Sequence, residues 1–495
     1  MSDFRPSLAH AAREARRTGR IRVWKEVSAD TETPVSAFLK IRRKPWGFLL
    51  ESVEGGERVG RYSFLGAGPS AVFTARGRLL EERRGDQVTV TKGDPLELLR
   101  RKFAKLRAAE PEPGLPRFDG GLVGYIGYDA VRWMEKLPGK PRDDLGIPEM
   151  VFMLAEDVLV FDRVRHTIRI VAHAGAAGGV RAAYAGACRR VDEIVRKLAA
   201  PASPPLSFDV GGAGLPPVVS NMTRQRFVAG VRKAKEYIRK GDIIQVVPSQ
   251  RFSAPFRGDP FVIYRAQRML NPSPYMFFLE CGGVTLAGSS PELLVRLEGD
   301  EVEVRPIAGT RPRGRSEAAD RRMEKSLLAD PKEKAEHVML VDLGRNDLGR
   351  VCRYGTVRVA DSMYVERYSH VMHLVSSVKG RVRRGVDAFE VLRACFPAGT
   401  VTGAPKVRAM EIIDELEPTS RGPYAGAVGY FGFSGNMDTA IAIRSVTVAE
   451  GKAHMQSGMG VVADSVPTRE YAESLAKAKA ALLSIAAANS VEGKR

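Results

Sequence analysis

Apolar residues recur at helical spacing in two segments of the chain beyond residue 222. The apolar face of the first segment carries Phe227, Val231, Ala234 and Ile238. Thr223 can cap this segment and Gly241 can end it, so the pattern predicts a helix between them and a strand over 243–247. The second such segment predicts a helix from 465 to 482, and the polar-then-apolar segment 331–350 is also expected to be helical.

Alternating apolar and polar residues predict a hairpin in which 293–297 pairs with 302–306. A register centred between Gly299 and Asp300 would place Ser290 opposite Gly309. It would also place Glu292 beside Ile307, because side chains opposite each other on two strands are neighbours.

A second hairpin is predicted from 441–448 and 453–456, which flank a turn at Glu450-Gly451-Lys452. A register centred on Gly451 would make Arg444 and Gly458 cross-strand neighbours. A slip of one residue would turn every side chain of the strand to the other face.

Helices alternate with hairpins rather than with single strands, which favours an α+β sandwich over a parallel, doubly wound sheet. A proline-rich stretch over 200–217 marks the better domain boundary. We therefore expect an N-terminal part over 1–200, a linker over 201–222, a second part over 223–488 and a tail over 489–495.

The net charge of +19 would attract polyanions, so nucleic-acid binding is one alternative to consider. The lysines and arginines are, however, spread along all 495 residues, and no zinc-finger, RNP-like or basic-zipper motif accompanies them. A dianionic metabolite or an acidic partner subunit explains the charge better, and we expect no nucleic acid as a partner.

The four cysteines are far apart, which indicates reduced thiols rather than a zinc site or a disulfide framework. No apolar run approaches the roughly 18 residues of a membrane span, and the N-terminus has no secretory signal pattern. We expect a cytoplasmic protein that does not associate with membranes.

Two glutamates on separate predicted helices are candidate metal ligands. Glu336 lies in the 331–350 helix, and Glu473 shares a face of the last helix with Glu470 and Lys477. Mg²⁺ takes one or two protein carboxylates and completes its octahedron with water and substrate oxygens. Solvated glutamates on a helix surface are the other interpretation, and the one that these residues alone favour.

Glycines and one arginine could bind an anionic substrate. Gly458-Met459-Gly460 and Gly309-Thr310 would let backbone N–H groups approach an anion, although both also suit ordinary turns. Arg444 lies in a predicted apolar strand, Ala440–Arg444, where an inward guanidinium would need an anionic partner. An outward arginine on an alternating strand is the other interpretation.

Two further residues could move protons. His373 lies in an apolar strand, where a histidine is either a satisfied core residue or a group poised for proton transfer near neutral pH. Glu292 follows Ser289-Ser290-Pro291 and is either an acid, a partner of a metal ligand or a surface residue at the start of a strand.

Taken together, these segments resemble the chorismate-utilising enzymes, and most closely the large subunits (component I) of anthranilate synthases. The resemblance is weak over 45–66 and strong over 225–480. Its long, specific motifs are Pro306–Gly314, Glu336–Asp347, Phe396–Met410 and Gly422–Tyr430.

The resemblance implies a four-layer α/β/β/α sandwich and Mg²⁺ bound by Glu336 and Glu473. It implies substrate contacts at Gly309, Thr310, Tyr424, Arg444, Gly458, Met459 and Gly460. Met459 departs from the small residue usual in the family at its position, which is harmless if the side chain points away.

The implied reaction adds ammonia to chorismate and then releases pyruvate to give anthranilate, with Glu292 assisting hydroxyl departure and His373 assisting proton removal. Ala308 and Gln245 stand where relatives with other nucleophiles carry lysines, so ammonia is the expected direct nucleophile. The alternative within the family is a synthase that stops at aminodeoxyisochorismate.

The chain shows no glutaminase motif, so the resemblance implies a separate glutamine amidotransferase subunit (component II), in a heterotetramer of two large and two small subunits. It also implies feedback inhibition by L-tryptophan, bound by Ser52, Pro274, Tyr275 and Met276. A simple contact between domains is the other interpretation of these four residues.

Overall fold

A computed structural model of the chain describes residues 4–52, 60–106, 112, 114–201, 214–368 and 371–492. Most of the expected linker (202–213 of 201–222) and the end of the expected tail lie outside these residues. The last helix continues to Glu492, into the segment expected to be a tail. No helix within the described ranges is long and apolar enough to cross a membrane.

Two large sheets dominate the described part of the chain, and their strands pair antiparallel throughout. The first sheet follows the order β1 (Arg20–Ser28), β10 (Thr167–Gly175), β9 (Asp157–Asp162), β3 (Tyr62–Ala67), β2 (Trp46–Glu51), β14 (Tyr275–Cys281), β15 (Thr285–Ser290), β24 (Ser445–Ala449), β25 (Lys452–Gly458), β13 (Ser249–Pro255), β11 (Val219–Ser220). It therefore joins strands from both halves of the sequence.

The second sheet also mixes the two halves. Its order is β18 (Ile307–Pro312), β20 (Val371–Arg381), β17 (Glu301–Val304), β16 (Leu293–Glu298), β23 (Met437–Ile441), β22 (Ala427–Gly432), β7 (Gly121–Ile126), β8 (Met150–Ala155), β4 (Ala71–Arg76), β5 (Leu79–Arg84), β6 (Gln87–Lys92), with β19 (Arg358–Arg367) paired to β20. A small ladder pairs β12 (Gln245–Val246) with β21 (Gly403–Ala404).

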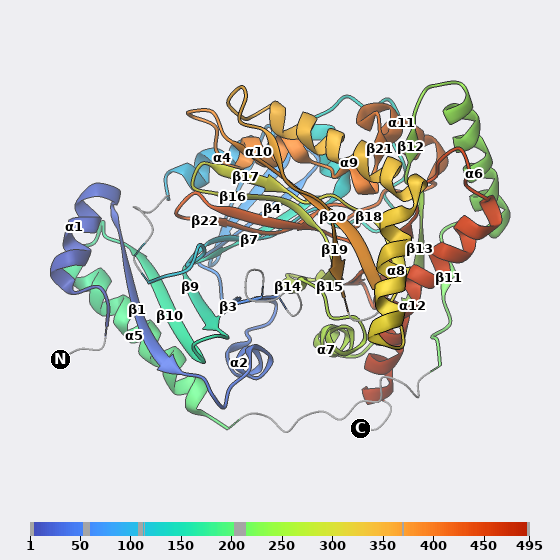
Figure 1. Ribbon diagram of the computed structural model, residues 1–495. Coiled ribbons are helices and arrows are strands. Elements are labelled where there is room, and N and C mark those ends of the chain that lie inside the picture. The colour runs from blue at the N-terminus through green and yellow to red at the C-terminus, as the bar shows by residue number, and fades with distance from the viewer. Residues whose placement is uncertain are drawn as a thin grey trace.

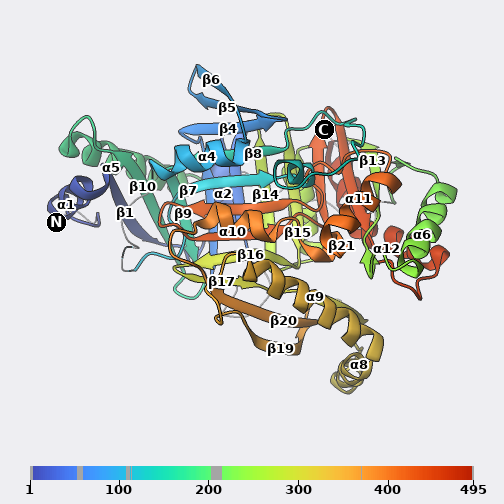
Figure 2. The same cartoon turned by 90° about the horizontal axis from the view of Figure 1, so that it is seen from above.

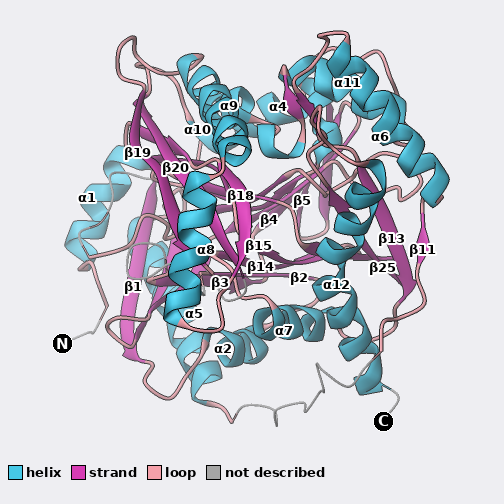
Figure 3. Cartoon of the chain, turned by 45° about the vertical axis from the view of Figure 1, so that its right-hand side comes forward, coloured by secondary structure: helices cyan, strands magenta, loops and turns pink. Residues whose placement is uncertain are grey.

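Helices cover the outer face of each sheet (Figures 1 and 2). The first sheet is covered by α1 (Leu8–Thr18), α2 (Pro34–Ile41), α5 (Val180–Ala199), α7 (Pro260–Leu270) and α12 (Pro467–Glu492). The second sheet lies beneath α4 (Pro95–Ala104), α8 (Glu317–Ala329), α9 (Pro331–Gly349), α10 (Ala388–Cys395), α11 (Lys406–Leu416) and the 3₁₀ turns Tyr128–Trp133 and Gly399–Val401, while α6 (Arg224–Arg239) packs against α12. Figure 3 separates the helical layers from the strands by colour.

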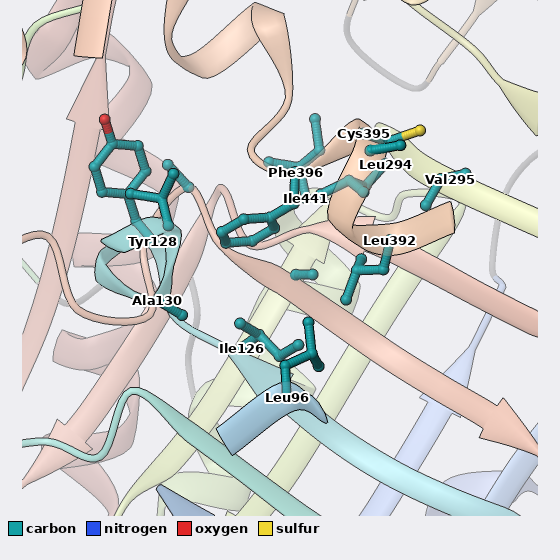
Figure 4. Packing of buried hydrophobic residues seen from close by; sticks show 14 of the residues in the cluster. Leu96, Ile126, Tyr128, Ala130, Leu294, Val295, Leu392, Cys395, Phe396 and Ile441 are labelled. Atoms are coloured by element: carbon teal, nitrogen blue, oxygen red, sulfur yellow. The ribbon is translucent and has the colours of Figure 1, made fainter. Parts of the chain in front are cut away.

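Three apolar clusters explain why four layers form. Neighbouring residues of one strand point to opposite faces, and here both faces are buried. Phe277 packs between the sheets while Phe278 packs against the helices of the first sheet. Val123 likewise packs between the sheets, whereas Leu122 joins the cluster beneath the helices of the second sheet. Part of that last cluster is drawn in Figure 4. The predicted α+β sandwich is confirmed.

Most local predictions are confirmed. Thr223 caps α6, and α9 and α12 form in the segments that were expected to be helical. The strand expected over 243–247 is reduced to the two residues of β12. The four cysteines are free thiols.

The first hairpin has the predicted centre, since Glu298 pairs with Glu301. Its extension was wrong: Ser290 lies opposite Tyr275 rather than Gly309. The physical reason is that β16 pairs with β17 on one side and with β23 on the other. β18 does not continue the hairpin, because it pairs with β20 and bulges at Gly309.

The second hairpin is shifted by one residue, because Ala449 pairs with Lys452 and leaves a two-residue turn. Both turn residues, Glu450 and Gly451, have positive φ (48° and 71°), as the tight turns of β-hairpins require. Arg444 and Gly458 are therefore not the predicted cross-strand pair.

Candidate active site

A cavity of about 680 Å³ lies where both sheets meet α9 and α12. The predicted site residues that line it are Glu292, Gly309, Thr310, Glu336, His373, Tyr424, Arg444, Gly458, Gly460 and Glu473. The fold thus brings together residues that are as much as 181 positions apart, from Glu292 to Glu473.

Glu292 sits in the turn that leads from β15 to β16, and 6% of its surface is exposed. Burial raises the pKa of its carboxyl to about 8, against the opposing effects of the neighbouring Thr400 hydroxyl, the Ile307 N–H group and the Arg444 charge. The predicted proximity to Ile307 is confirmed. A carboxyl with this pKa is mostly protonated at pH 7, so it can donate a proton.

His373 lies on β20 with its Nδ1 atom 3.0 Å from both the Gly309 carbonyl oxygen and Thr310 Oγ1. Burial lowers the pKa of the imidazole to about 4, so the ring is neutral at pH 7. Because a carbonyl oxygen only accepts, Nδ1 carries the proton and Nε2 keeps a free lone pair. His373 therefore has the protonation state of a general base.

Arg444 occupies the break between β23 and β24 rather than a strand, with φ 50°. Its half-buried guanidinium faces Glu292 and Tyr368, and burial lowers its pKa. Among the described residues the guanidinium makes neither a hydrogen bond nor an ion pair within 4 Å. A carboxylate in the cavity would satisfy this charge.

Gly458 lies between two polar side chains. Its N–H group donates to the Tyr424 hydroxyl, whose pKa is raised to about 12 by burial, and its carbonyl oxygen accepts from Lys477 Nζ at 3.2 Å. A Cβ at this position would lie 2.8 Å from the Tyr424 oxygen. Glycine is needed here for close approach.

Met459 does not line the cavity, which corrects its inclusion among the predicted substrate contacts. Its side chain is 1% exposed within the apolar cluster beneath the helices of the second sheet. Its N–H group donates to the Pro248 carbonyl oxygen at 3.3 Å. The larger side chain is tolerated because it points away from the cavity.

The two predicted metal ligands share the cavity but differ in setting. Glu336 on α9 is half-buried, accepts from Gln245 Nε2 at 3.0 Å, and has a pKa raised by burial and by Glu333. Glu473 on α12 has a side chain 51% exposed and pairs with Lys477 at 2.8 Å. Glu470 also lines the cavity, and burial raises its pKa.

These groups fit a hard divalent cation. Gln245 Oε1 is buried without a partner in the described residues, and carboxylate and amide oxygens are suitable ligands for Mg²⁺. Gly460 makes room for this arrangement, since a Cβ there would lie 2.3 Å from Gln245 Nε2.

Sequence reasoning did not single out Thr400 or Lys332, which also line the cavity. Thr400 belongs to the long motif Phe396–Met410, so that motif was the available signal. Lys332 lies one turn before Glu336 on α9, and no local pattern separates it from the other exposed lysines.

A second cavity lies between the sheets. Its walls include Ser52, Pro274, Tyr275 and Met276, the four residues predicted for tryptophan binding. The same cavity is lined by Arg117, Arg296 and Asp438, and Arg296 donates to the Tyr275 hydroxyl at 2.9 Å.

Comparison with known proteins decides the family. Residues 48–483 match the profile of the chorismate binding enzymes. The chain belongs to the chorismate-binding enzyme family. Within this family it groups with anthranilate synthase component 1. The protein of that name from Acetivibrio thermocellus is 48% identical over 495 residues, covering 99% of this chain and 100% of that protein.

Other members of the chorismate-binding enzyme family agree. Anthranilate synthase component 1 of Pseudomonas putida is 47% identical, covering 95% of this chain and 96% of its own length. The crystal structure of anthranilate synthase component I from Streptococcus pneumoniae superposes with a TM-score of 0.77 at 34% identity, covering 92% of this chain and 99% of that one. The four-layer sandwich predicted from the motifs is the fold of this family.

Proposed function

We propose that this chain is a lyase that converts chorismate and ammonia to anthranilate and pyruvate, the first step towards tryptophan. The observation that carries the proposal is the grouping of a protonated acid, a neutral imidazole and an arginine without a hydrogen-bond partner among the described residues around one cavity. Glu292, His373 and Arg444 supply these groups. Near full-length similarity to anthranilate synthase component 1 supports the same reaction.

In the first step, ammonia attacks C2 of chorismate while the C4 hydroxyl leaves. Glu292 donates its proton to the departing oxygen, so that water rather than hydroxide is released. The product of this step is aminodeoxyisochorismate. Ala308 and Gln245 favour ammonia as the nucleophile, because they offer no amine where relatives with other nucleophiles carry lysines: the first is an alkyl group, and the second is an amide bound to Glu336.

In the second step, His373 removes the proton from C2 through Nε2. The ring becomes aromatic as the enolpyruvyl group departs and is protonated to pyruvate. Arg444 binds a substrate carboxylate, and Thr310, Tyr424, Gly458 and Gly460 complete the contacts around the substrate.

Glu336 and Glu473 would hold a Mg²⁺ ion, with Gln245 Oε1 available as a further oxygen. When bound, the ion screens the ring carboxylate of the substrate and supports electron flow towards the ring. To bind the ion, Glu473 would have to break its ion pair with Lys477. The charge of this lysine also acts on Glu336.

The Glu336→Gln substitution is expected to abolish the Mg²⁺ response of the enzyme, because a neutral amide replaces the more buried of the two carboxylates. Loss of a metal that contributes several kcal/mol should reduce kcat/KM by about 10³-fold. The measurement is activity against Mg²⁺ concentration. Glu317→Gln on α8, whose side chain is 83% exposed, is the matched control. Unchanged Mg²⁺ dependence in Glu336→Gln would remove this residue from the metal site.

Ammonia would come from a glutamine amidotransferase subunit, component II, in a heterotetramer of two large and two small chains. The cavity lined by Ser52, Pro274, Tyr275 and Met276 would bind L-tryptophan as a feedback inhibitor. The aromatic and apolar walls suit an indole, and the charged Arg117, Arg296 and Asp438 suit its amino-acid group.

Incubation of the purified chain with chorismate, Mg²⁺ and ammonium at alkaline pH tests the proposed function. Fluorescent anthranilate and an equal amount of pyruvate are expected. A non-aromatic amino product without pyruvate would identify a synthase that stops after the first step. Absence of chorismate turnover, together with salt-sensitive RNA or DNA binding, would refute the proposal in favour of a nucleic-acid-binding protein.

A further inference from the structure

The two cavities share a short connecting segment between α7 and β14. Asn271, at one end of this segment, lines the active-site cavity. Pro274, Tyr275 and Met276, at its other end, line the cavity proposed for tryptophan. A displacement of residues 271–276 would therefore move residues that line both cavities.

Ser289 ties this segment to the neighbouring strand β15. Its hydroxyl donates to the Asn271 carbonyl oxygen, accepts from Asn271 Nδ2 at 3.2 Å and lies 2.9 Å from Ser273 Oγ. A serine hydroxyl carries one proton, which goes either to the Asn271 carbonyl oxygen or to Ser273 Oγ, while its oxygen accepts from Asn271 Nδ2. Ser289 is 1% exposed and, like Asn271, lines the active-site cavity.

The backbone of Ser289 holds Arg444. Its N–H group donates to the Arg444 carbonyl oxygen at 3.2 Å, next to the point where Gly288 pairs with Ser445. Arg444 has φ 50°, a conformation that a residue other than glycine keeps only when its surroundings impose it. Since no described side chain holds the guanidinium by a hydrogen bond, its backbone determines where it points.

We infer that Ser289 is a positioning residue that couples the 271–276 segment to Arg444. The pairing of Ser289 with Met276 and of Ser290 with Tyr275 places the wall of one cavity directly beside the strand that supports the other. A ligand that shifts this wall displaces the end of β15, and with it the Arg444 backbone. The inference rests on the proposed tryptophan regulation and identifies how an occupied regulatory cavity weakens substrate binding.

The test measures the coupling between two ligands by calorimetry. The tryptophan Kd is determined with Mg²⁺ present and ammonium absent, with and without saturating chorismate. In the unaltered chain chorismate should weaken tryptophan binding by about 5–150-fold. In Ser289→Ala this ratio should fall at least about fivefold, because the hydroxyl that joins the two segments is gone. Ser273→Ala, which removes one partner of that hydroxyl, should reduce the ratio by a smaller factor.

Ser484→Ala is the matched control, since Ser484 is equally buried and its hydroxyl bonds, among the residues that the structure describes, to the Ala481 carbonyl oxygen of its own helix. A full coupling ratio in both Ser289→Ala and Ser273→Ala would overturn the inference while leaving the tryptophan site intact. No tryptophan binding by the unaltered chain would instead refute the regulatory site itself. If Ser289→Ala does not fold, as judged by its thermal unfolding, Ser273→Ala decides the matter.

Discussion

Replacing Glu292 with glutamine is expected to lower the ammonia-dependent kcat by about 10²–10⁴-fold, the range contributed by a single general acid. Glutamine keeps the shape of the side chain but has no acidic proton for the departing C4 hydroxyl. Substrate binding should change little, because Arg444 and the glycine-lined wall remain. The measurement is kcat and KM for chorismate at saturating ammonium and Mg²⁺.

The pH dependence gives a second readout for Glu292. Burial raises its pKa to about 8, so the acid is protonated and active below pH 8 and becomes ionised and inactive above it. The rate per free ammonia molecule should therefore fall as pH rises through about 8. In Glu292→Gln this alkaline decline should disappear, because no group titrates at that position.

Glu298→Gln is the matched control for Glu292→Gln. Glu298 ends the strand that Glu292 precedes, and it is exposed to solvent. It should leave both kcat and the pH profile unchanged. If the rate of Glu292→Gln still falls with rising pH as it does in the unaltered chain, the group that titrates is a residue other than Glu292.

The His373→Gln substitution is expected to lower anthranilate formation by about 10²–10⁴-fold while the first step continues. The amide of glutamine cannot accept the C2 proton, so aromatisation is blocked after ammonia has been added. The amino intermediate should therefore accumulate. Chromatography of the reaction products, with pyruvate measured in parallel, distinguishes this outcome from a general loss of activity.

His454→Gln provides the control for a buried histidine. Burial lowers the pKa of His454 to about 4 as well, but its Nδ1 atom lies 2.8 Å from Ser253 Oγ and it does not line the cavity. Normal anthranilate formation is expected. If His373→Gln stops chorismate consumption without any amino product, His373 acts in the first step and the assigned role is wrong.

Local sequence determined the helices that carry the site. Thr223 and Asp330 cap α6 and α9 through their own side chains, so these helices begin where short-range hydrogen bonds allow. The long motifs determined the family, because motifs of this length are specific. Residue chemistry and the resemblance over 225–480 together indicated ten residues that the fold does bring to one cavity.

Hairpin registers were only partly accessible from sequence. The turn at Gly299-Asp300 was located correctly, yet the turn at Glu450-Gly451 was misplaced by one residue. The alternation of apolar and polar residues is compatible with either position of the hairpin turn. The two-residue turn forms only if a residue such as Glu450 adopts positive φ. That choice is settled by neighbouring strands rather than by the turn alone.

The sequence by itself therefore determined the helices, the α+β class and the identity of most candidate site residues, since these depend on spacing and residue chemistry. Only the tertiary structure decided that Met459 faces the core, that Arg444 lies in a strand break, and that Ser289 joins two cavities. It also decided the protonation states of Glu292 and His373. Burial and long-range contacts set these properties, and both arise from segments that are distant along the chain.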